Sequence, residues 1–133
     1  MHQFDLKNRT AIITGGAQGF GLDIAKRFLK SGARAIIWDI DEKELLKVIK
    51  ELNNPNVSYN VVDVSNFKNV KETVDKITKS SNIDILINNA GITGSTSSLW
   101  DYDVDEWNKI IQINLMGTFN CCKCVVPNMI KNN

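Results

Sequence analysis

Three glycines near the start of the chain have a spacing that suits a phosphate group. Gly15, Gly19 and Gly21 follow a short apolar run and precede an apolar-periodic segment, so they predict a strand, a tight turn and a helix start. Glycines let the backbone adopt positive φ and let a phosphate approach the amides, and a helix N-terminus adds free N–H groups. The segment from Thr14 to Gly21 therefore predicts a pyrophosphate cradle; the alternative is a purely structural turn.

The second predicted strand ends in an acidic residue. Residues 35–38 are apolar, and Asp39 follows them directly. In a strand–helix–strand unit the tip of the second strand lies beside the first glycine turn, where a carboxylate can accept hydrogen bonds from adenosine ribose hydroxyls. The same carboxylate would repel a 2′-phosphate, and Gln18 brings no positive charge into the glycine loop. These residues predict NAD rather than NADP; the alternative is that Asp39 only caps a solvated strand end.

Polar and small residues also follow the next two predicted strands. The strand over residues 57–64 ends in Asp63 and Val64, and the strand over residues 83–87 runs into Asn-Asn-Ala-Gly at residues 88–91. Glycine and alanine at the carboxyl end of a strand leave room for a nucleotide. An asparagine amide can pair with backbone groups that are left open where a sheet splits.

Two of these runs together resemble a known family. Thr-Gly-x-x-x-Gly-x-Gly at residues 14–21, followed by Asn-Asn-Ala-Gly at residues 88–91, resembles two signatures of the short-chain dehydrogenase/reductase family. The resemblance spans nearly the whole chain but only the first half of a typical member, and residues 88–129 look most like 3-oxoacyl-carrier-protein reductases and related sugar or polyol dehydrogenases. It implies that residues 1–133 are the N-terminal portion of a longer NAD(P)-binding Rossmann domain. It also implies hydride transfer between NAD(H) and a secondary alcohol or ketone.

The resemblance further implies roles for particular residues. It assigns cofactor binding to Gly15, Gln18, Gly19, Phe20, Gly21, Asp39, Asp63, Val64, Asn89, Ala90 and Gly91. Asp63 and Val64 would bracket the adenine ring; the alternative is that Asp63 caps the next helix or turn. Asn114 would be the catalytic asparagine, which holds a water of a proton relay; the alternative is a helix-bending or core amide. Asn88 is implied to be structural.

Catalysis in this family needs residues that these 133 do not supply. It uses a Ser and a Tyr-x-x-x-Lys pair, in which the Tyr acts as general acid or base at the substrate oxygen. Tyr59 and Tyr102 are not such residues, because Asp63 and Glu106 stand four positions later. We therefore expect no dehydrogenase activity from the 133 residues alone. An inactive NAD-binding or interaction module is the alternative function, and a methyltransferase is disfavoured by the Asn-Asn-Ala-Gly run and by Asn114.

The composition of the chain indicates which kinds of molecule it binds. A chain of 133 residues with 43% hydrophobic and 23% charged residues suits one packed domain. The formal net charge of +1 and the scattered charges favour neither nucleic acid nor an anionic membrane surface. No stretch approaches the roughly 20 apolar residues of a membrane helix. The sequence predicts a cytoplasmic protein with a small-molecule substrate.

Three cysteines lie close together in the sequence. Cys121, Cys122 and Cys124 are odd in number, so they cannot all pair with one another. A structural zinc ion would need a fourth ligand, and the only histidine is His2. We therefore expect no metal site and thiols that pack in the core.

The elements that must position these residues alternate between strands and helices. The run at 11–13 lacks polar alternation, which predicts a strand covered on both faces as in parallel sheets, and further strands are predicted over residues 35–38, 57–64 and 83–87. Helical spacing between them completes a doubly wound α/β fold. The resemblance gives the strand order 3-2-1-4, an incomplete form of the family's sheet that leaves the fourth strand at an edge.

The longest predicted helix spans residues 105–130 and is apolar on almost every side. A helix that is apolar all round is buried all round, so one face can cover the sheet and the other needs further protein. The resemblance implies a homo-oligomer that pairs through this helix, which contains Asn114. Pro127 either ends the helix or only kinks it.

Overall fold

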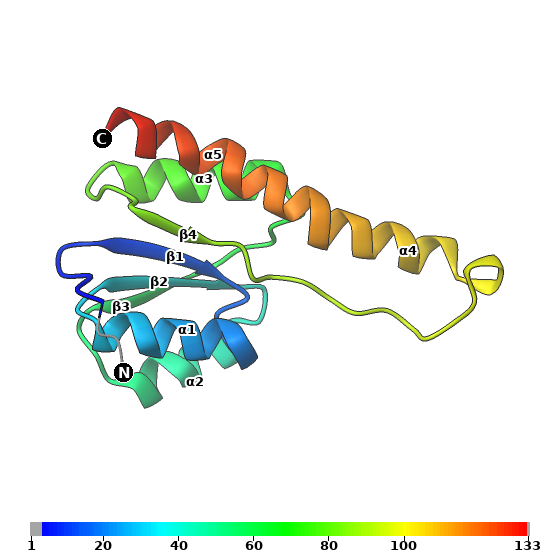
Figure 1. The fold of residues 1–133 in the computed structure, drawn as a ribbon, viewed down its shortest axis with the longest axis horizontal. Coiled ribbons are helices and arrows are strands. Elements are labelled where there is room, and N and C mark those ends of the chain that lie inside the picture. Colours follow the sequence, from blue (N-terminus) through cyan, green and yellow to red (C-terminus); the bar gives the residue numbers. More distant parts are fainter. Residues whose placement is uncertain (1–3, 133) are drawn as a thin grey trace.

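A four-stranded parallel sheet forms the centre of the computed structural model, which describes residues 4–132 (Figure 1). The strands are β1 (Thr10–Thr14), β2 (Arg34–Asp39), β3 (Val57–Val61) and β4 (Ile85–Ile87). Their order is β3-β2-β1-β4, and each neighbouring pair is parallel. The predicted fold class and strand order are confirmed, although β3 ends at Val61, earlier than the strand predicted over residues 57–64.

Side chains of β1 and β2 enter two separate cores. One core receives Ala11, Ile13, Ala35 and Ile37, and the other receives Ile12, Ile36 and Trp38. The division follows from the two-residue period of a strand, which sends successive side chains to opposite faces. Because helices cover both faces, both sets are apolar, and this explains the missing polar alternation in the sequence.

Two pairs of helices cover the sheet. On one face lie α1 (Gly19–Lys30) and α2 (Glu42–Leu52); on the other lie α3 (Phe67–Thr78) and α5 (Gly117–Lys131) (Figure 1). Asp41 and Asn66 are the N-cap residues of α2 and α3, and the side chain of each accepts a hydrogen bond from a backbone N–H of the first turn.

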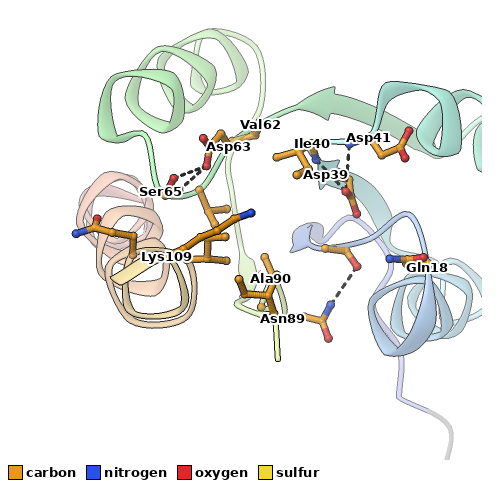
Figure 2. Close-up of a pocket in the computed structure, with 16 residues that line it drawn as sticks. Gln18, Asp39, Ile40, Asp41, Val62, Asp63, Ser65, Asn89, Ala90 and Lys109 are labelled. Atoms are coloured by element: carbon orange, nitrogen blue, oxygen red, sulfur yellow. Dashed lines mark hydrogen bonds between the residues drawn. The ribbon is translucent and has the colours of Figure 1, made fainter. Parts of the chain in front are cut away.

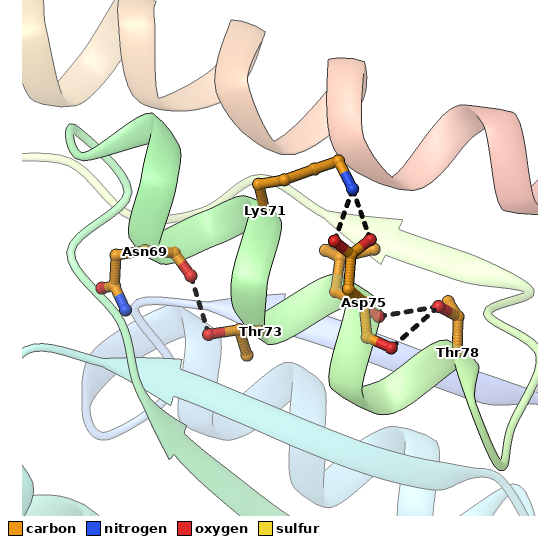
Figure 3. Close-up of polar contacts among 6 residues, drawn as sticks. Asn69, Lys71, Thr73, Asp75 and Thr78 are labelled. Carbon is orange, nitrogen blue, oxygen red and sulfur yellow. Dashed lines mark hydrogen bonds and ion pairs between the residues drawn. The ribbon is translucent and has the colours of Figure 1, made fainter.

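Helix α3 lies beneath α5 and satisfies its own polar groups (Figure 3). Thr73 is buried, and its hydroxyl donates to the carbonyl of Asn69 at 2.8 Å. Lys71 pairs with Asp75 one turn later, at half-exposed positions. The apolar side of α3 can therefore pack against the core without leaving a buried hydroxyl unpaired.

The predicted long helix is continuous but not uniform. It consists of α4 (Val104–Ile111), the π-helical turn η2 (Gln112–Met116) and α5. A single-turn 3-10 helix, η1 (Leu99–Asp101), precedes α4. Pro127 lies inside α5, which runs on to Lys131, so the proline does not end the helix. Helix α4 and the segment before it project away from the sheet (Figure 1).

One side of this helical region is covered and the other is open. Gly117, Cys121 and Val125 are buried toward the sheet. The opposite side exposes a set of large apolar side chains: Trp107, Ile111, Leu115, Met116, Phe119, Val126 and Ile130. The expectation of burial on every side is therefore not met within the described chain. Between residues 4 and 132, no helix has both the length and the apolar character to cross a bilayer.

Candidate functional site

A pocket of about 570 Å³ opens at the carboxyl ends of the four strands. Its size falls within the usual range for small-molecule sites. Segments that follow β1, β2, β3 and β4 line it, together with the end of α4 and the start of η2 (Figure 2). The lining residues are Gly15, Gln18, Asp39, Ile40, Asp41, Val62, Asp63, Val64, Ser65, Asn89, Ala90, Gly91, Ile92, Lys109, Gln112 and Ile113.

The glycine loop forms one wall, and its backbone requires glycine. Gly15 has φ +62° and Gly19 has φ +55°, values that other residues rarely adopt. A Cβ on Gly15 would lie 2.9 Å from Asn89 Nδ2, whereas a Cβ on Gly19 would meet no atom within 4 Å. The loop is therefore packed against the sheet on one side and open on the other.

Helix α1 begins from this loop without a side-chain cap. The side chain of its N-cap residue, Gln18, makes no capping hydrogen bond, and the first turn holds no acidic residue. In contrast, the carboxylates of Asp41 and Asp103 cap α2 and α4. Uncapped first-turn amides and the helix dipole favour an anion at this point.

Thr14 and Asn89 tie β1 to β4 at the back of the pocket. The hydroxyl of Thr14 accepts hydrogen bonds from the backbone N–H groups of Asn89 (3.0 Å) and Ala90 (2.9 Å). The side-chain amide of Asn89 donates to the carbonyls of Thr14 (3.0 Å) and Gly15 (3.1 Å). After β1 the chain continues to a helix on one face of the sheet, and after β4 it continues to a helix on the other face. Ligands usually bind at such a point in a doubly wound sheet.

Asp39 sits between the glycine loop and the start of α2. Its carboxylate accepts a hydrogen bond from the backbone N–H of Ala17 at 3.2 Å. It also accepts from the backbone N–H groups of Ile40 (2.8 Å) and Asp41 (3.3 Å) (Figure 2). These bonds aim the carboxylate along the rim of the pocket. Asp39 therefore does more than cap a strand end, because it also holds the glycine loop against β2.

Asp63 shapes the turn between β3 and α3. Its carboxylate accepts hydrogen bonds from the backbone N–H (2.9 Å) and the hydroxyl (2.6 Å) of Ser65. Its own N–H donates to the side chain of Asn69 on α3 at 2.8 Å. The alternative given for Asp63, that it caps the following turn, is thus met in the structure, and Asp63 also lines the pocket.

An apolar slot lies between this turn and the end of β4. Val62, Val64, Ala90 and Ile113 line the pocket and belong to one hydrophobic cluster. Sequence reasoning identified Val64 and Ala90 but missed Val62 and Ile113. A signal for Ile113 existed, since it directly precedes Asn114.

Lys109 is a further lining residue that sequence reasoning missed. Among the described residues that line the pocket it is the only cation, and it faces a rim that holds Asp39, Asp41 and Asp63 (Figure 2). It lies on α4 four residues before Ile113, so both side chains fall on one side of the helix. This spacing was available in the sequence.

Asn114 makes a closed pair with the segment that follows β4. Its Oδ1 accepts from the N–H of Ile92, and its Nδ2 donates to the carbonyl of Ile92, both at 2.8 Å. The residue is exposed and lies in the π-helical turn, so it is not a core amide. Its side chain fixes the chain just beyond Gly91. A catalytic role for Asn114 stays a prediction.

Several predicted residues lie beside the pocket rather than on its wall. Gly19, Phe20 and Gly21 form the first turn of α1, and the Phe20 side chain is 84% exposed. A Cβ on Gly21 would lie 2.2 Å from the carbonyl oxygen of Gly15, so the helix start packs directly on the loop. Asn88 points away from the glycine loop and donates to Cys122 Sγ at 3.4 Å.

Cys121 and Cys124 belong to the core on the α5 side, whereas Cys122 is half-buried and lies outside it. Burial raises the pKa of the Cys121 thiol to about 12, and the neighbouring Cys122 and Cys124 add to the shift. At neutral pH Cys121 is therefore a protonated packing group rather than a nucleophile. In the part of the chain that the structure describes, no three metal-ligating side chains gather at one point. His2 lies outside the described residues.

Comparison with known proteins agrees with the fold. A family model described as short chain dehydrogenase matches residues 9–133. The chain is 38% identical over 125 residues to the 2-dehydro-3-deoxy-L-rhamnonate dehydrogenase (NAD(+)) of Sphingomonas sp. (strain SKA58), covering 93% of this chain and 49% of that protein. It is 40% identical over 129 residues to a 3-oxoacyl-(acyl-carrier-protein) reductase of Chlamydia pneumoniae, covering 95% and 52%.

A solved structure gives the same result in three dimensions. The 3-ketoacyl-(acyl-carrier-protein) reductase from Brucella melitensis, complexed with NADH, superposes with a TM-score of 0.90 at 30% identity. The match covers 96% of this chain and 52% of that one. The chain thus spans about half the length of the relatives it matches. Its sheet order, its glycine loop and the family match over residues 9–133 lead to one conclusion: the chain belongs to the short-chain dehydrogenase family.

Proposed function

We propose that the pocket holds the adenosine and pyrophosphate part of a nicotinamide dinucleotide, and that residues 1–133 are the cofactor-binding portion of a longer short-chain dehydrogenase domain. One observation carries the proposal. Gln18 at the uncapped start of α1, the Asp39 carboxylate and the apolar slot line a single pocket where β1 and β4 diverge. An anion, a ribose and a flat ring are the three parts of a dinucleotide that such walls suit.

Each part of the cofactor has a matching group in the chain. The open side of the glycine loop and the first turn of α1 would hold the pyrophosphate, and Gly19 leaves the space for it. Val62, Val64, Ala90 and Ile113 would enclose the adenine ring. Asp39 would accept hydrogen bonds from the ribose hydroxyls. When bound, the nicotinamide ring supplies hydride transfer, and this chain's residues bind and orient the cofactor for it.

Charge favours NAD(H) over NADP(H). Asp39 and Asp41 lie at the rim where the ribose would sit, and Gln18 adds no positive charge there. Like charges about 5 Å apart repel by about 3 kcal/mol at an effective dielectric constant near 20, before screening by salt. The names of two relatives agree, since one is an NAD(+) dehydrogenase and one was crystallised with NADH.

The substrate we propose is a secondary alcohol or ketone, in the class of the sugar-acid and 3-oxoacyl substrates that the relatives' names give. Asn114 would contribute by holding the chain beyond Gly91 and by ordering a water of a proton relay. Its pairing with Ile92 supports the first of these roles.

We further propose that the protein pairs with a second copy through the open side of η2 and α5. Leu115 and Phe119 are 61% and 52% exposed there. Monomeric proteins rarely expose large apolar side chains in a contiguous patch. The proposal follows the family's common interface and commits to a second copy of this protein as the occupant.

The cofactor proposal is tested by titrating the natural protein with NADH and NADPH and following the fluorescence of the bound reduced nicotinamide. We expect NADH to bind at least about tenfold more tightly, and we expect Asp39→Ser to weaken NADH and to reduce or invert the ratio. Asp105→Ser, which removes an exposed carboxylate that does not line the pocket, serves as the matched control. Equal affinities for NADH and NADPH in the natural protein, unmoved by Asp39→Ser, would contradict the assignment of Asp39.

A further inference from the structure

Val64, on the wall of the apolar slot, is held from behind by α5. The side chain of Asn120 is 4% exposed, and its Nδ2 donates to the carbonyl of Val64 at 2.9 Å. Gly117, one turn earlier on the same helix, allows the close approach, because a Cβ there would lie 2.7 Å from Val64 Cγ2. Val64 is therefore in contact with α5 in two ways: its carbonyl accepts a hydrogen bond from Asn120, and its side chain packs against Gly117.

The opposite side of the same turn is held by α3. The side chain of Asn69, on α3, accepts from the N–H of Asp63, and the Asp63 carboxylate closes the turn on Ser65. The turn between β3 and α3 is thus fastened at Asp63 by α3 and at Val64 by α5. Loss of either fastening would let one wall of the slot move.

We propose that Asn120 is a positioning residue for the adenine half of the cofactor, acting through the Val64 carbonyl. The inference rests on the proposed function, since the slot is taken to hold adenine. Asn120 does not line the pocket, so it would touch no part of the cofactor. A buried carbonyl that loses its partner costs free energy, and a shift of the Val64 backbone that finds it a new partner would carry the Val64 side chain out of place in the slot.

The same helix offers a matched control. Asn128 also reaches from α5 to the backbone, where its Oδ1 accepts from the N–H of Ile83 at 3.0 Å, at the opposite end of β4 from the pocket. Removing either side chain takes one hydrogen bond of similar length from α5. Only the bond of Asn120 ends on the pocket wall.

The experiment compares Asn120→Ala with Asn128→Ala in the natural protein, using calorimetric titration with AMP and fluorescence titration with NADH. We expect Asn120→Ala to weaken both ligands by about three- to fivefold, within the limit that the worth of one buried hydrogen bond sets, and Asn128→Ala to leave both within about twofold. Urea unfolding of the two variants shows whether any global destabilisation is shared. Asn120→Ser, which keeps a hydroxyl donor, replaces the alanine variant if that variant does not fold.

A double-mutant cycle separates positioning from general structure. If Asn120 acts through Val64, then Val64→Ala should cost less AMP affinity in the Asn120→Ala background than in the natural protein. Additive losses, or equal losses from Asn120→Ala and Asn128→Ala, would overturn the inference while leaving the proposed function intact. Failure of the natural protein to bind either AMP or NADH would instead remove the proposed function, and the inference with it.

Discussion

Gly21 is the most tightly enclosed point of the glycine loop. A Cβ there would lie 2.2 Å from the carbonyl oxygen of Gly15 and 2.6 Å from Asn89 Nδ2. Because the first contact is with backbone, it cannot be relieved by a change of rotamer. We expect Gly21→Ala to lower the free energy of unfolding by about 2–3 kcal/mol in urea denaturation.

Gly19 provides the comparison for Gly21. It has φ +55° but no atom within 4 Å of an added Cβ, so Gly19→Ala meets backbone strain and no collision. We expect a loss of about 1 kcal/mol, smaller than the loss at Gly21. If Gly21→Ala proved as stable as the natural protein, the packing of the helix start on the loop would be wrong.

At the level of single residues, the sequence was most informative where a residue type is uncommon at that place in a fold. Glycine spacing and an acidic strand end place Gly15 and Asp39 at the pocket without knowledge of the structure. Val62 and Lys109 were missed because a strand valine and a helix lysine are common in any setting. The bonds of Asn89 to the Thr14 and Gly15 carbonyls could not be derived either, since they depend on how β1 and β4 diverge.

At the level of elements, periodicity found the helix over residues 105–130 but not its change of winding. Apolar spacing is nearly the same for an α-helix and for a helix with one π turn, so the turn at Gln112–Met116 left no pattern. Asn114 lies within that turn and pairs with Ile92. Exposure of the outer side was also beyond the sequence, because it depends on which neighbours are present.

Pro127 gives a prediction about α5. The proline has no N–H to donate to the carbonyl of Lys123 four residues earlier, yet the helix continues past it. Pro127→Ala restores that donor, and we expect it to raise the free energy of unfolding by about 1–2 kcal/mol after the greater entropy of the unfolded chain is deducted.

Lys131, one turn later on α5, supplies the control for Pro127. It is exposed and polar, so Lys131→Ala should change stability by no more than about 0.5 kcal/mol. Both variants are measured by urea denaturation under the same conditions. A fall in stability with Pro127→Ala would show that the proline serves the folded helix in some other way.

At the level of the whole molecule, the two sides of η2 and α5 have different surroundings. The inner side closes the core over β4 and fastens the Val64 wall, while the outer side presents apolar surface. If the outer side pairs with a second copy, Leu115→Glu together with Phe119→Glu should convert a dimer to a monomer in sedimentation equilibrium. The cost of burying two carboxylates in an apolar interface is the reason.

A control for this pairing comes from the other face of the molecule. Leu46 on α2 is exposed to a similar degree, so Leu46→Glu should leave the oligomeric state unchanged. NADH affinity should survive in all of these variants, because none of the three residues lines the pocket. A natural protein that is monomeric at micromolar concentration would contradict the proposed pairing.

The most direct test of the account is a crystal structure of the natural protein with NAD⁺ bound. The account predicts adenine between Val64 and Ile113, ribose hydroxyls on the Asp39 carboxylate, and the pyrophosphate at the first turn of α1. Each of these placements can be seen independently in the electron density. A dinucleotide bound elsewhere, or none in this pocket at saturating NAD⁺, would contradict the central claim.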